Sequence, residues 1–155
     1  MSEFESPAFP TVGDRRIPAK FTCDGQDVSP PLRWNVSLPD GSAIAAYAIT
    51  VTDPDAHGFV HWVVAGIPGT VTALPEGAGN ANAGNGLRQG RNDFGRLGYG
   101  GPCPPPGRAH RYEFALYAFA QAPSLPDHPT LAQIKAAAVG VDGASVNGFS
   151  AFYGR

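Results

Sequence analysis

The sequence has few charged residues and no long apolar segment. Only 15% of its 155 residues are charged and the formal net charge is −2, so no strong field favours nucleic acid or an anionic membrane as a partner. No apolar run approaches the roughly 20 residues that span a bilayer, and residues 1–6 have neither the basic nor the apolar part of a secretory signal. We therefore expect a cytoplasmic protein that binds no nucleic acid and does not cross a membrane.

Cysteine is also scarce, and Cys23 and Cys103 are the only two. Neither belongs to a Cys-x-x-Cys pair, which excludes a typical zinc site and a disulfide framework of the kind that small secreted domains use. Their spacing does not show whether the two side chains meet, so their redox state stays open.

Glycine and proline are abundant instead. The 20 Gly and 16 Pro residues recur with no fixed period and alternate with strand-like runs, which indicates many turns between strands rather than disorder. A chain of 155 residues is long enough to bury a core without stabilising metals or disulfides. We expect a single domain over residues 1–155.

Apolar runs without a helical period predict a mainly β protein. Strand patterns occupy four segments, Ile44–Val51, Val60–Ile67, His110–Phe119 and Phe149–Tyr153. Thr130 and Gln133 form a capping-box pattern ahead of one short helix. Between Leu74 and Pro106 glycine and asparagine dominate, and a segment of this length without secondary structure is usually functional or disordered. Many strands, long turns and one helix predict a Greek-key β-sandwich.

Ionisable side chains gather between the first two of these strands. Pro54 cannot donate a ladder hydrogen bond and disfavours helix at Asp53, so the first strand should end there. Asp53, Asp55, His57 and His61 then lie on one short connection or at its strand ends, a position typical of functional sites. A histidine flanked by apolar residues is more typical of a core, so this pattern alone favours a buried structural role for His61.

Two segments together resemble the signatures of the phosphatidylethanolamine-binding protein family. The first is Asp-Pro-Asp…His-Trp-Val-Val…Ile-Pro at 53–68, and the second is Gly-Tyr-Gly-Gly-Pro-Cys-Pro-Pro…Gly…His-Arg-Tyr at 98–112. Residues 21–25, 29–34 and 153–155 are similar to the family's bacterial Raf-kinase-inhibitor-like branch. The likeness covers nearly the whole chain.

The resemblance implies a Greek-key β-sandwich with a small pocket for phosphate, phosphorylated headgroups or small carboxylates. It implies a binding protein, often a homodimer in bacteria, for which peripheral contact with a lipid headgroup is an option. We expect no cofactor and no metal. Asp55 carries over as a supporting residue. The pocket residues that carry over are Asp53, His61, Pro102, Cys103, Pro104, His110 and Tyr112.

A phosphoryl group needs hydrogen-bond donors around it. The rings of His61 and His110 can each donate an N–H, Tyr112 a hydroxyl, and the turn at 100–104 its free backbone N–H groups. The carboxylate of Asp53 repels a dianion, so we expect it to accept a proton from an imidazole, or to meet the ammonium of a zwitterionic headgroup. Neither signature contains Lys, so modest affinity is expected.

The sequence departs from the family pattern at two positions near this site. His57 stands where the family usually has a proline, which removes a residue that sets the backbone and adds a titratable ring. Gly66 stands where an asparagine or aspartate often precedes Ile-Pro. We expect His57 to be either a solvated loop residue or a participant in catalysis.

Two other functions remain open. An isomerase, cyclase or hydrolase would use His57, His61, His110 and Asp53 for acid–base work. Covalent catalysis is not expected, because the sequence has no Gly-x-Ser-x-Gly elbow and Cys103 lies in a proline turn without a helix to activate it. A metal site from Asp53, His61 and His110 is allowed by residue type but lacks a short ligand spacing.

Overall fold

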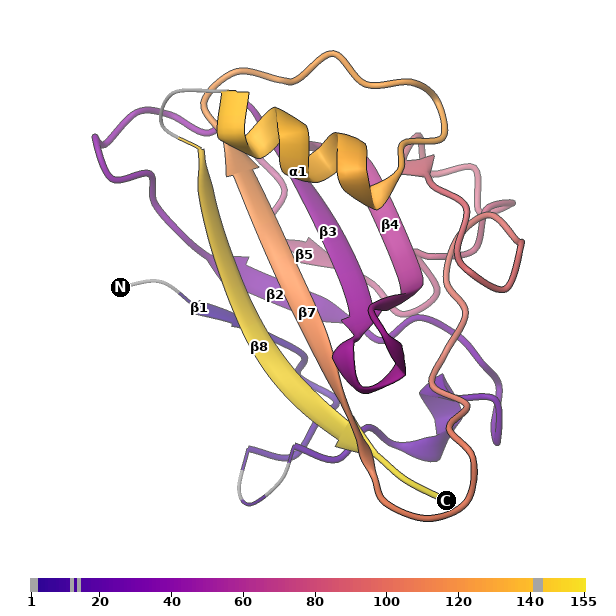
Figure 1. Ribbon diagram of the computed structural model, residues 1–155. Helices are drawn as coiled ribbons and strands as arrows, with labels where there is room; N and C mark the ends of the chain where they lie inside the picture. Colours follow the sequence, from indigo (N-terminus) through magenta and orange to yellow (C-terminus); the bar gives the residue numbers. More distant parts are fainter. Residues whose placement is uncertain (1–2, 12, 14, 141–143) are drawn as a thin grey trace.

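The computed structural model describes residues 3–11, 13, 15–140 and 144–155, and there the protein consists of two antiparallel β-sheets with one α-helix. Figure 1 shows the larger sheet with the helix across it and the smaller sheet behind. The larger sheet has the order β6 (Arg88–Gln89), β4 (Phe59–Pro68), β3 (Ala46–Asp53), β7 (His110–Phe119) and β8 (Ser145–Tyr153). The smaller sheet has the order β1 (Glu3–Glu5), β2 (Leu32–Asn35) and β5 (Ala73–Leu74). Two 3₁₀ turns, η1 (Ala19–Phe21) and η2 (Pro54–Ala56), and the helix α1 (Leu131–Gly140) complete the elements.

The strand order confirms the predicted β-sandwich. Strand β3 pairs antiparallel with β4, and β4 pairs antiparallel with β6. Strand β7 then pairs antiparallel with β3, on the edge of β3 opposite to β4. An order in which the fourth strand lies beside the first defines a Greek key. Because β7 is antiparallel to β3, it begins at the end of the sheet where β3 ends, and the long connection from β6 leads to that end.

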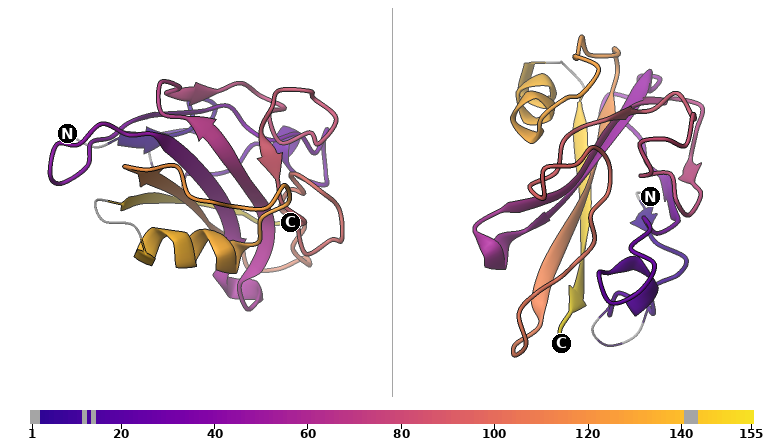
Figure 2. Two further views of the ribbon diagram at one scale, coloured as in Figure 1. Left: turned by 90° about the horizontal axis from the view of Figure 1, so that it is seen from above. Right: turned by 90° about the vertical axis from the view of Figure 1, so that its right-hand side faces the viewer.

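Two apolar layers flank the larger sheet. Between the sheets lies an aromatic core that includes Trp34, Trp62 and Phe114, each no more than 4% exposed. On the other face α1 inserts Ile134, which is fully buried, against Val63 and Phe119. Figure 2 shows this layering, with α1 on one side of the larger sheet and the N-terminal segments on the other.

The element boundaries follow local signals in the sequence. Pro54 ends β3 at Asp53 as predicted. The capping box of α1 forms in both directions, because the Thr130 N–H donates to Gln133 Oε1 (2.9 Å) and the Gln133 N–H donates to Thr130 Oγ1 (3.1 Å). The predicted strands are confirmed, with ends displaced by up to four residues. No helix in the described ranges is long and apolar enough to cross a bilayer.

The glycine- and asparagine-rich segment has little secondary structure but is ordered by its own hydrogen bonds. The side chain of Asn92, 3% exposed, accepts from the N–H groups of Phe94 (2.9 Å) and Arg96 (3.2 Å) and donates to the carbonyl of Gly98 (3.0 Å). The buried side-chain amide of Asn92 therefore stabilises the turn at 92–96.

A disulfide joins the two cysteines, whose pairing the sequence leaves open. The Cα atoms of Cys23 and Cys103 are 5.4 Å apart and the two residues are separated by 80 positions. Beside the bond, the Cys23 N–H donates to the carbonyl of Pro102 (3.1 Å). The loop after η1 is thereby fastened to the proline turn that follows the glycine-rich segment.

Removing this disulfide should lower the free energy of unfolding. A cross-link over 80 positions restricts the unfolded chain, and such links typically contribute about 2–4 kcal/mol. We expect the double variant Cys23→Ser/Cys103→Ser to have a free energy of unfolding that is lower by that amount. Urea unfolding monitored by tryptophan fluorescence measures the difference, and the variant should have the lower midpoint. Reductant should move the wild type toward the same midpoint and leave the double variant unchanged. Equal midpoints for wild type and variant would contradict this expectation.

Candidate functional site

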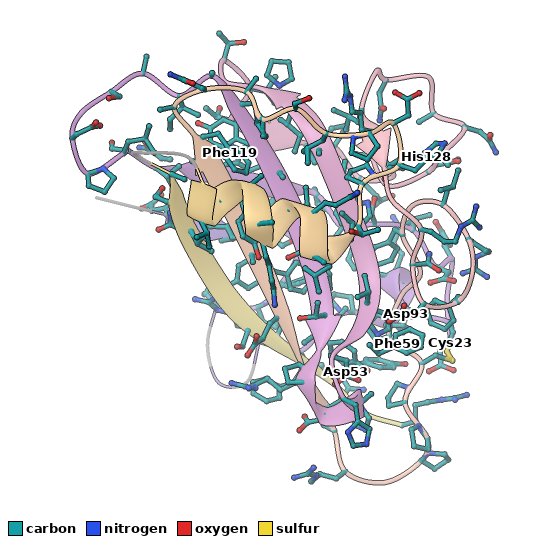
Figure 3. All side chains as sticks on the ribbon, turned by 45° about the horizontal axis from the view of Figure 1, so that its top comes forward. Cys23, Asp53, Phe59, Asp93, Phe119 and His128 are labelled. Atoms are coloured by element: carbon teal, nitrogen blue, oxygen red, sulfur yellow. A yellow bond between two sulfur atoms is a disulfide. The ribbon has the colours of Figure 1, made fainter. Side chains whose placement is uncertain are left out.

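A cavity of about 140 Å³ lies at the end of the larger sheet where β3 ends and β4 and β7 begin. Its polar side chains are those of Asp53, His61, His110 and Tyr112. The rest of its lining is formed by Ala56, Phe59, Phe94, Cys103, Pro104 and Pro105. Figure 3 shows Asp53, Phe59 and Asp93 gathered toward this end of the sheet and Phe119 at the other.

The carboxylate of Asp53 links β3, η2 and β7 at the buried end of this cavity, which we call its floor. It is 3% exposed, and its Oδ2 accepts from Nδ1 of His110 at 2.6 Å while its Oδ1 accepts from the N–H of Asp55 at 2.9 Å. Since an ionised carboxylate can only accept, Nδ1 of His110 carries a hydrogen. The contact fixes the ring of His110 at the start of β7 and leaves Nε2 to act toward other groups.

A β-bulge aims His61 into the cavity. Trp62 and Val60 face consecutive residues of β3, so His61 is an extra residue on β4. Regular alternation would turn its ring to the face opposite Trp62. Instead the ring lies on the core side against Tyr112, with centroids 5.3 Å apart.

The neutral form of His61 is favoured. Its Nδ1 lies 2.7 Å from the carbonyl oxygen of Gly100, which can only accept, so this nitrogen carries the hydrogen. Burial lowers the pKa of His61 below its ordinary value, and the Gly100 carbonyl and the Asp53 carboxylate only partly oppose that effect. A neutral ring protonated at Nδ1 offers its other nitrogen as an acceptor. That both histidines donate an N–H to a ligand stays a prediction, and for His61 it requires the charged ring.

Most backbone donors of the proline turn are already in use. The N–H of Gly100 donates to the carbonyl of His61 (2.9 Å), and the N–H of Gly101 donates to Oδ1 of Asp27 (2.7 Å). Pro102 is buried and does not line the cavity. Within the ranges that the structure describes, the N–H of Cys103 is the remaining backbone donor of this turn.

Tyr112 lies between the two histidine rings. Its ring packs edge-on against His61 and is stacked on His110 with centroids 6.3 Å apart. Burial, with the nearby Asp53 carboxylate as the next cause, raises the pKa of Tyr112 well above its ordinary value. The hydroxyl therefore stays protonated and can donate a hydrogen bond.

Asp55 and His57 lie outside the cavity lining. Oδ2 of Asp55 accepts from the backbone N–H of Arg111 at 2.8 Å, and this hydrogen bond is the main cause that lowers the pKa of Asp55. Asp55 thus fastens η2 to β7. His57 is exposed and follows η2 in a left-handed conformation with φ = 57°.

Four lining residues are absent from the site predicted from sequence: Ala56, Phe59, Phe94 and Pro105. Phe94 had a signal, because Asn92-Asp93-Phe94-Gly95 stands out as a turn within the glycine-rich segment. The arginines of the same segment are not among the residues that line this cavity. Arg88, Arg91 and Arg96 are all exposed.

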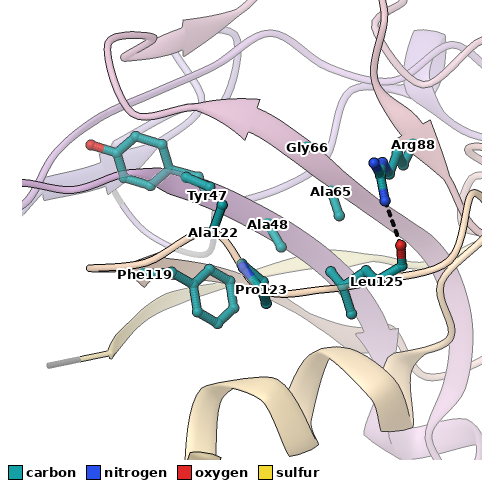
Figure 4. A pocket seen from close by; sticks show the side chains of 10 residues that line it. Tyr47, Ala48, Ala65, Gly66, Arg88, Phe119, Ala122, Pro123 and Leu125 are labelled. Atoms are coloured by element: carbon teal, nitrogen blue, oxygen red, sulfur yellow. Dashed lines mark hydrogen bonds between the residues drawn. The ribbon is translucent and has the colours of Figure 1, made fainter. Parts of the chain in front are cut away.

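A second cavity, of about 110 Å³, lies on the α1 side of the sheet and is bordered by small residues such as Ala48 and Ala65. Figure 4 shows Arg88 at its side, where the guanidinium donates to the carbonyl of Leu125. Among the residues that the structure describes, neither a histidine nor a carboxylate borders this cavity. In the described part of the chain, no cluster of three or more His, Cys, Asp or Glu has the arrangement of a metal site.

Known proteins resemble this chain over most of its length. The family profile described as phosphatidylethanolamine-binding protein matches residues 8–149. The UPF0098 protein of Aquifex aeolicus is 45% identical over 105 residues, which cover 66% of this chain and 60% of that protein. UPF0098 protein YbcL of Escherichia coli is 46% identical over 105 residues, which cover 63% and 56%. Putative lipoprotein LppC of Mycobacterium tuberculosis is 44% identical over 118 residues, which cover 74% and 54%.

Solved structures share the fold. The crystal structure of E. coli YbcL, described as a new member of the mammalian PEBP family, superposes with a TM-score of 0.83 at 30% identity over 99% of this chain and 98% of that one. A PEBP homologue from Chlamydia trachomatis gives 0.81 at 29% identity over 99% and 97%. The sequence matches to the three curated relatives span between 54% and 60% of their lengths.

The burial of His61 should make folding stability fall in mild acid. Because the pKa of His61 in the folded state lies below the ordinary 6.5, the unfolded chain binds more protons as the pH falls below that value. The contribution of His61 is complete above pH 6.5 and is lost progressively as the pH falls toward the folded-state pKa. We expect urea unfolding between neutral pH and about pH 5 to show a steeper loss for wild type than for His61→Asn. Equal slopes would show that the ring does not titrate with folding.

The left-handed conformation of His57 should control the stability of its loop. Its φ of 57° costs a residue with a side chain about 1 kcal/mol, and a proline, held near −65°, cannot adopt it at all. We expect His57→Gly to raise the thermal midpoint and His57→Pro to lower the free energy of unfolding by more than about 1 kcal/mol. A His57→Pro variant as stable as wild type would mean that the loop adopts another conformation.

Proposed function

The chain belongs to the phosphatidylethanolamine-binding protein family, and we propose that it is a binding protein for small anions. The ligands are phosphate, phosphorylated headgroups or small carboxylates, and the binding site is the cavity at the end of the larger sheet. Asp53, His61, Cys103, Pro104, His110 and Tyr112 form the site, supported by Pro102 and Asp55 from outside the lining.

The observation that carries this proposal is a cavity of about 140 Å³ whose lining brings together the side chains of Asp53, His61, His110 and Tyr112. An apolar cavity of roughly 150 Å³ admits benzene, so this one admits a group of phosphate or carboxylate size. The donors are the Tyr112 hydroxyl, the Cys103 N–H and, when the ring is charged, Nε2 of His110. A pocket with a few convergent polar groups in an apolar lining is typical of small-molecule sites.

The charge of the site favours a ligand that keeps a proton or an ammonium. When the ring of His110 carries both hydrogens, its pair with the Asp53 carboxylate is neutral as a whole. No Lys or Arg belongs to the described lining, and neutral His61 presents an acceptor nitrogen. A monoprotonated phosphate or a zwitterionic headgroup suits this arrangement better than a dianion, and the affinity is modest.

A second candidate function is acid–base catalysis by the Asp53–His110 pair. The 2.6 Å contact orients an imidazole beside a small cavity, which is the arrangement of a general base. His57 lies outside the lining, and Cys103 is bound in the disulfide. The reaction class left to this site is general acid–base chemistry, as in an isomerase, cyclase or hydrolase.

The disulfide bears on where the protein works. Disulfides persist in oxidising compartments and are rare in the cytosol, so the Cys23–Cys103 bond argues against the cytoplasmic location expected from composition. We propose an oxidising compartment, in keeping with the relatives named putative lipoproteins. The homodimer stays a prediction.

Calorimetry with inorganic phosphate and O-phosphoethanolamine tests the proposed site. We expect one site for which the two compounds compete, and His110→Ala and Asp53→Asn should each weaken binding by about tenfold or more. His128→Ala is the matched control, because His128 is exposed, lies outside the cavity lining and, in the described ranges, has its side-chain hydrogen bond with the carbonyl of Gln89. Absence of binding by wild type, or unchanged binding by His110→Ala, would overturn the proposal. Turnover of a ligand that depends on His110 would favour the enzyme.

A further inference from the structure

An aromatic ring stands exposed at the mouth of the pocket. Phe94 is 41% exposed, and in the described ranges the other exposed large hydrophobic residues are two valines. Phe94 lines the cavity and packs edge-on against Phe59 and His61, with centroid distances of 4.8 and 5.5 Å. Because the exposed ring is also part of the lining, a ligand that fills the cavity can cover it.

The position of Phe94 is fixed by the turn that carries it and by its contacts with Gly100 and Arg96. The turn that carries it is fastened to β4, because the Val60 N–H donates to Oδ2 of Asp93 (2.7 Å) and the Asp93 N–H donates to the Val60 carbonyl (2.8 Å). The ring lies against Gly100, where an added Cβ would come within 2.4 Å of Cδ2 of Phe94. The Arg96 guanidinium covers the ring at 5.3 Å from its centroid. The exposed ring is therefore in a fixed position before any ligand arrives, which reduces the entropy cost of contact.

The pocket has a polar floor and an apolar mouth. Asp53, His110 and Tyr112 supply the polar groups at the strand ends, whereas Phe59 and Phe94 offer none. Inorganic phosphate presents oxygens on every side, so those turned to the two rings would lose their hydration without a new partner. An anion that carries an organic substituent removes this mismatch, because the substituent meets the rings.

We propose that Phe94, with Phe59, selects anions that carry an apolar or flat organic substituent over inorganic phosphate. This inference rests on the proposed anion site and assigns the chemical class of its ligand as an organic phosphate ester or carboxylate. Phe94 contacts the substituent, while the floor of the pocket holds the anionic group.

Calorimetry with phenyl phosphate and inorganic phosphate at about pH 5, where both ligands keep a proton, tests the assignment. Wild type should bind phenyl phosphate more tightly. Phe94→Ala should weaken phenyl phosphate binding by roughly tenfold, the typical value of an aromatic contact with its buried area, and change inorganic phosphate binding by less than about twofold. Phe94→Leu, which keeps an apolar side chain, should fall between the two.

Two controls separate the outcomes. Val139→Ala truncates an exposed apolar residue on α1 and should change neither affinity, and urea unfolding shows whether each variant is folded. Equal weakening of both ligands by Phe94→Ala, or no weakening of either, would overturn the role of Phe94 and leave the anion site in place. Failure of wild type to bind any anion would overturn the anion site and this role together.

Vesicles of phosphatidylcholine containing phosphatidic acid distinguish the source of the ester. Cosedimentation that Phe94→Ala reduces identifies a lipid headgroup as the ligand, and phenyl phosphate binding without cosedimentation identifies a soluble ester. Both results support the role of Phe94. Cosedimentation at the wild-type level with Phe94→Ala, despite an intact anion site, would overturn it for lipids.

Discussion

The buried carboxylate of Asp53 is the contact on which the end of the larger sheet depends. It accepts from His110 at the start of β7 and from Asp55 in η2, while its own backbone ends β3. A buried charge without such partners is strongly destabilising, so the three elements must meet at this point. The orientation of His110 and the shape of the pocket floor both follow from that requirement.

Much of the fold was readable because its signals are local. Pro54 ended β3, alternating apolar residues marked β7 and β8, and Thr130 with Gln133 began α1 where the capping box predicted it. The polar half of the pocket was predicted from family resemblance, and the structure brings Asp53, His61, His110 and Tyr112 together. Their role in binding stays a prediction.

The rest depends on register and on contacts between distant segments, which no local pattern encodes. The bulge that turns His61 toward Tyr112 arises from how β4 pairs with β3. The Cys23–Cys103 bond joins residues 80 positions apart. The donors of the proline turn are consumed because Asp27, from a remote loop, reaches Gly101. The sequence therefore predicts which residues lie at the floor, but not that Nδ1 of His61, Nδ1 of His110 and the N–H of Gly101 already have hydrogen-bond partners within the protein.

The contact between Gly100 and the ring of Phe94 has a consequence for related proteins. Because a side chain at position 100 would occupy the space of the ring, the two positions cannot change independently. Relatives with an aromatic residue at the place of Phe94 should keep glycine at the place of Gly100, and those that lose the glycine should carry a smaller residue opposite. An alignment of the family would record this as correlated substitution, and relatives could be sorted by it into those with a wide and those with a narrow opening.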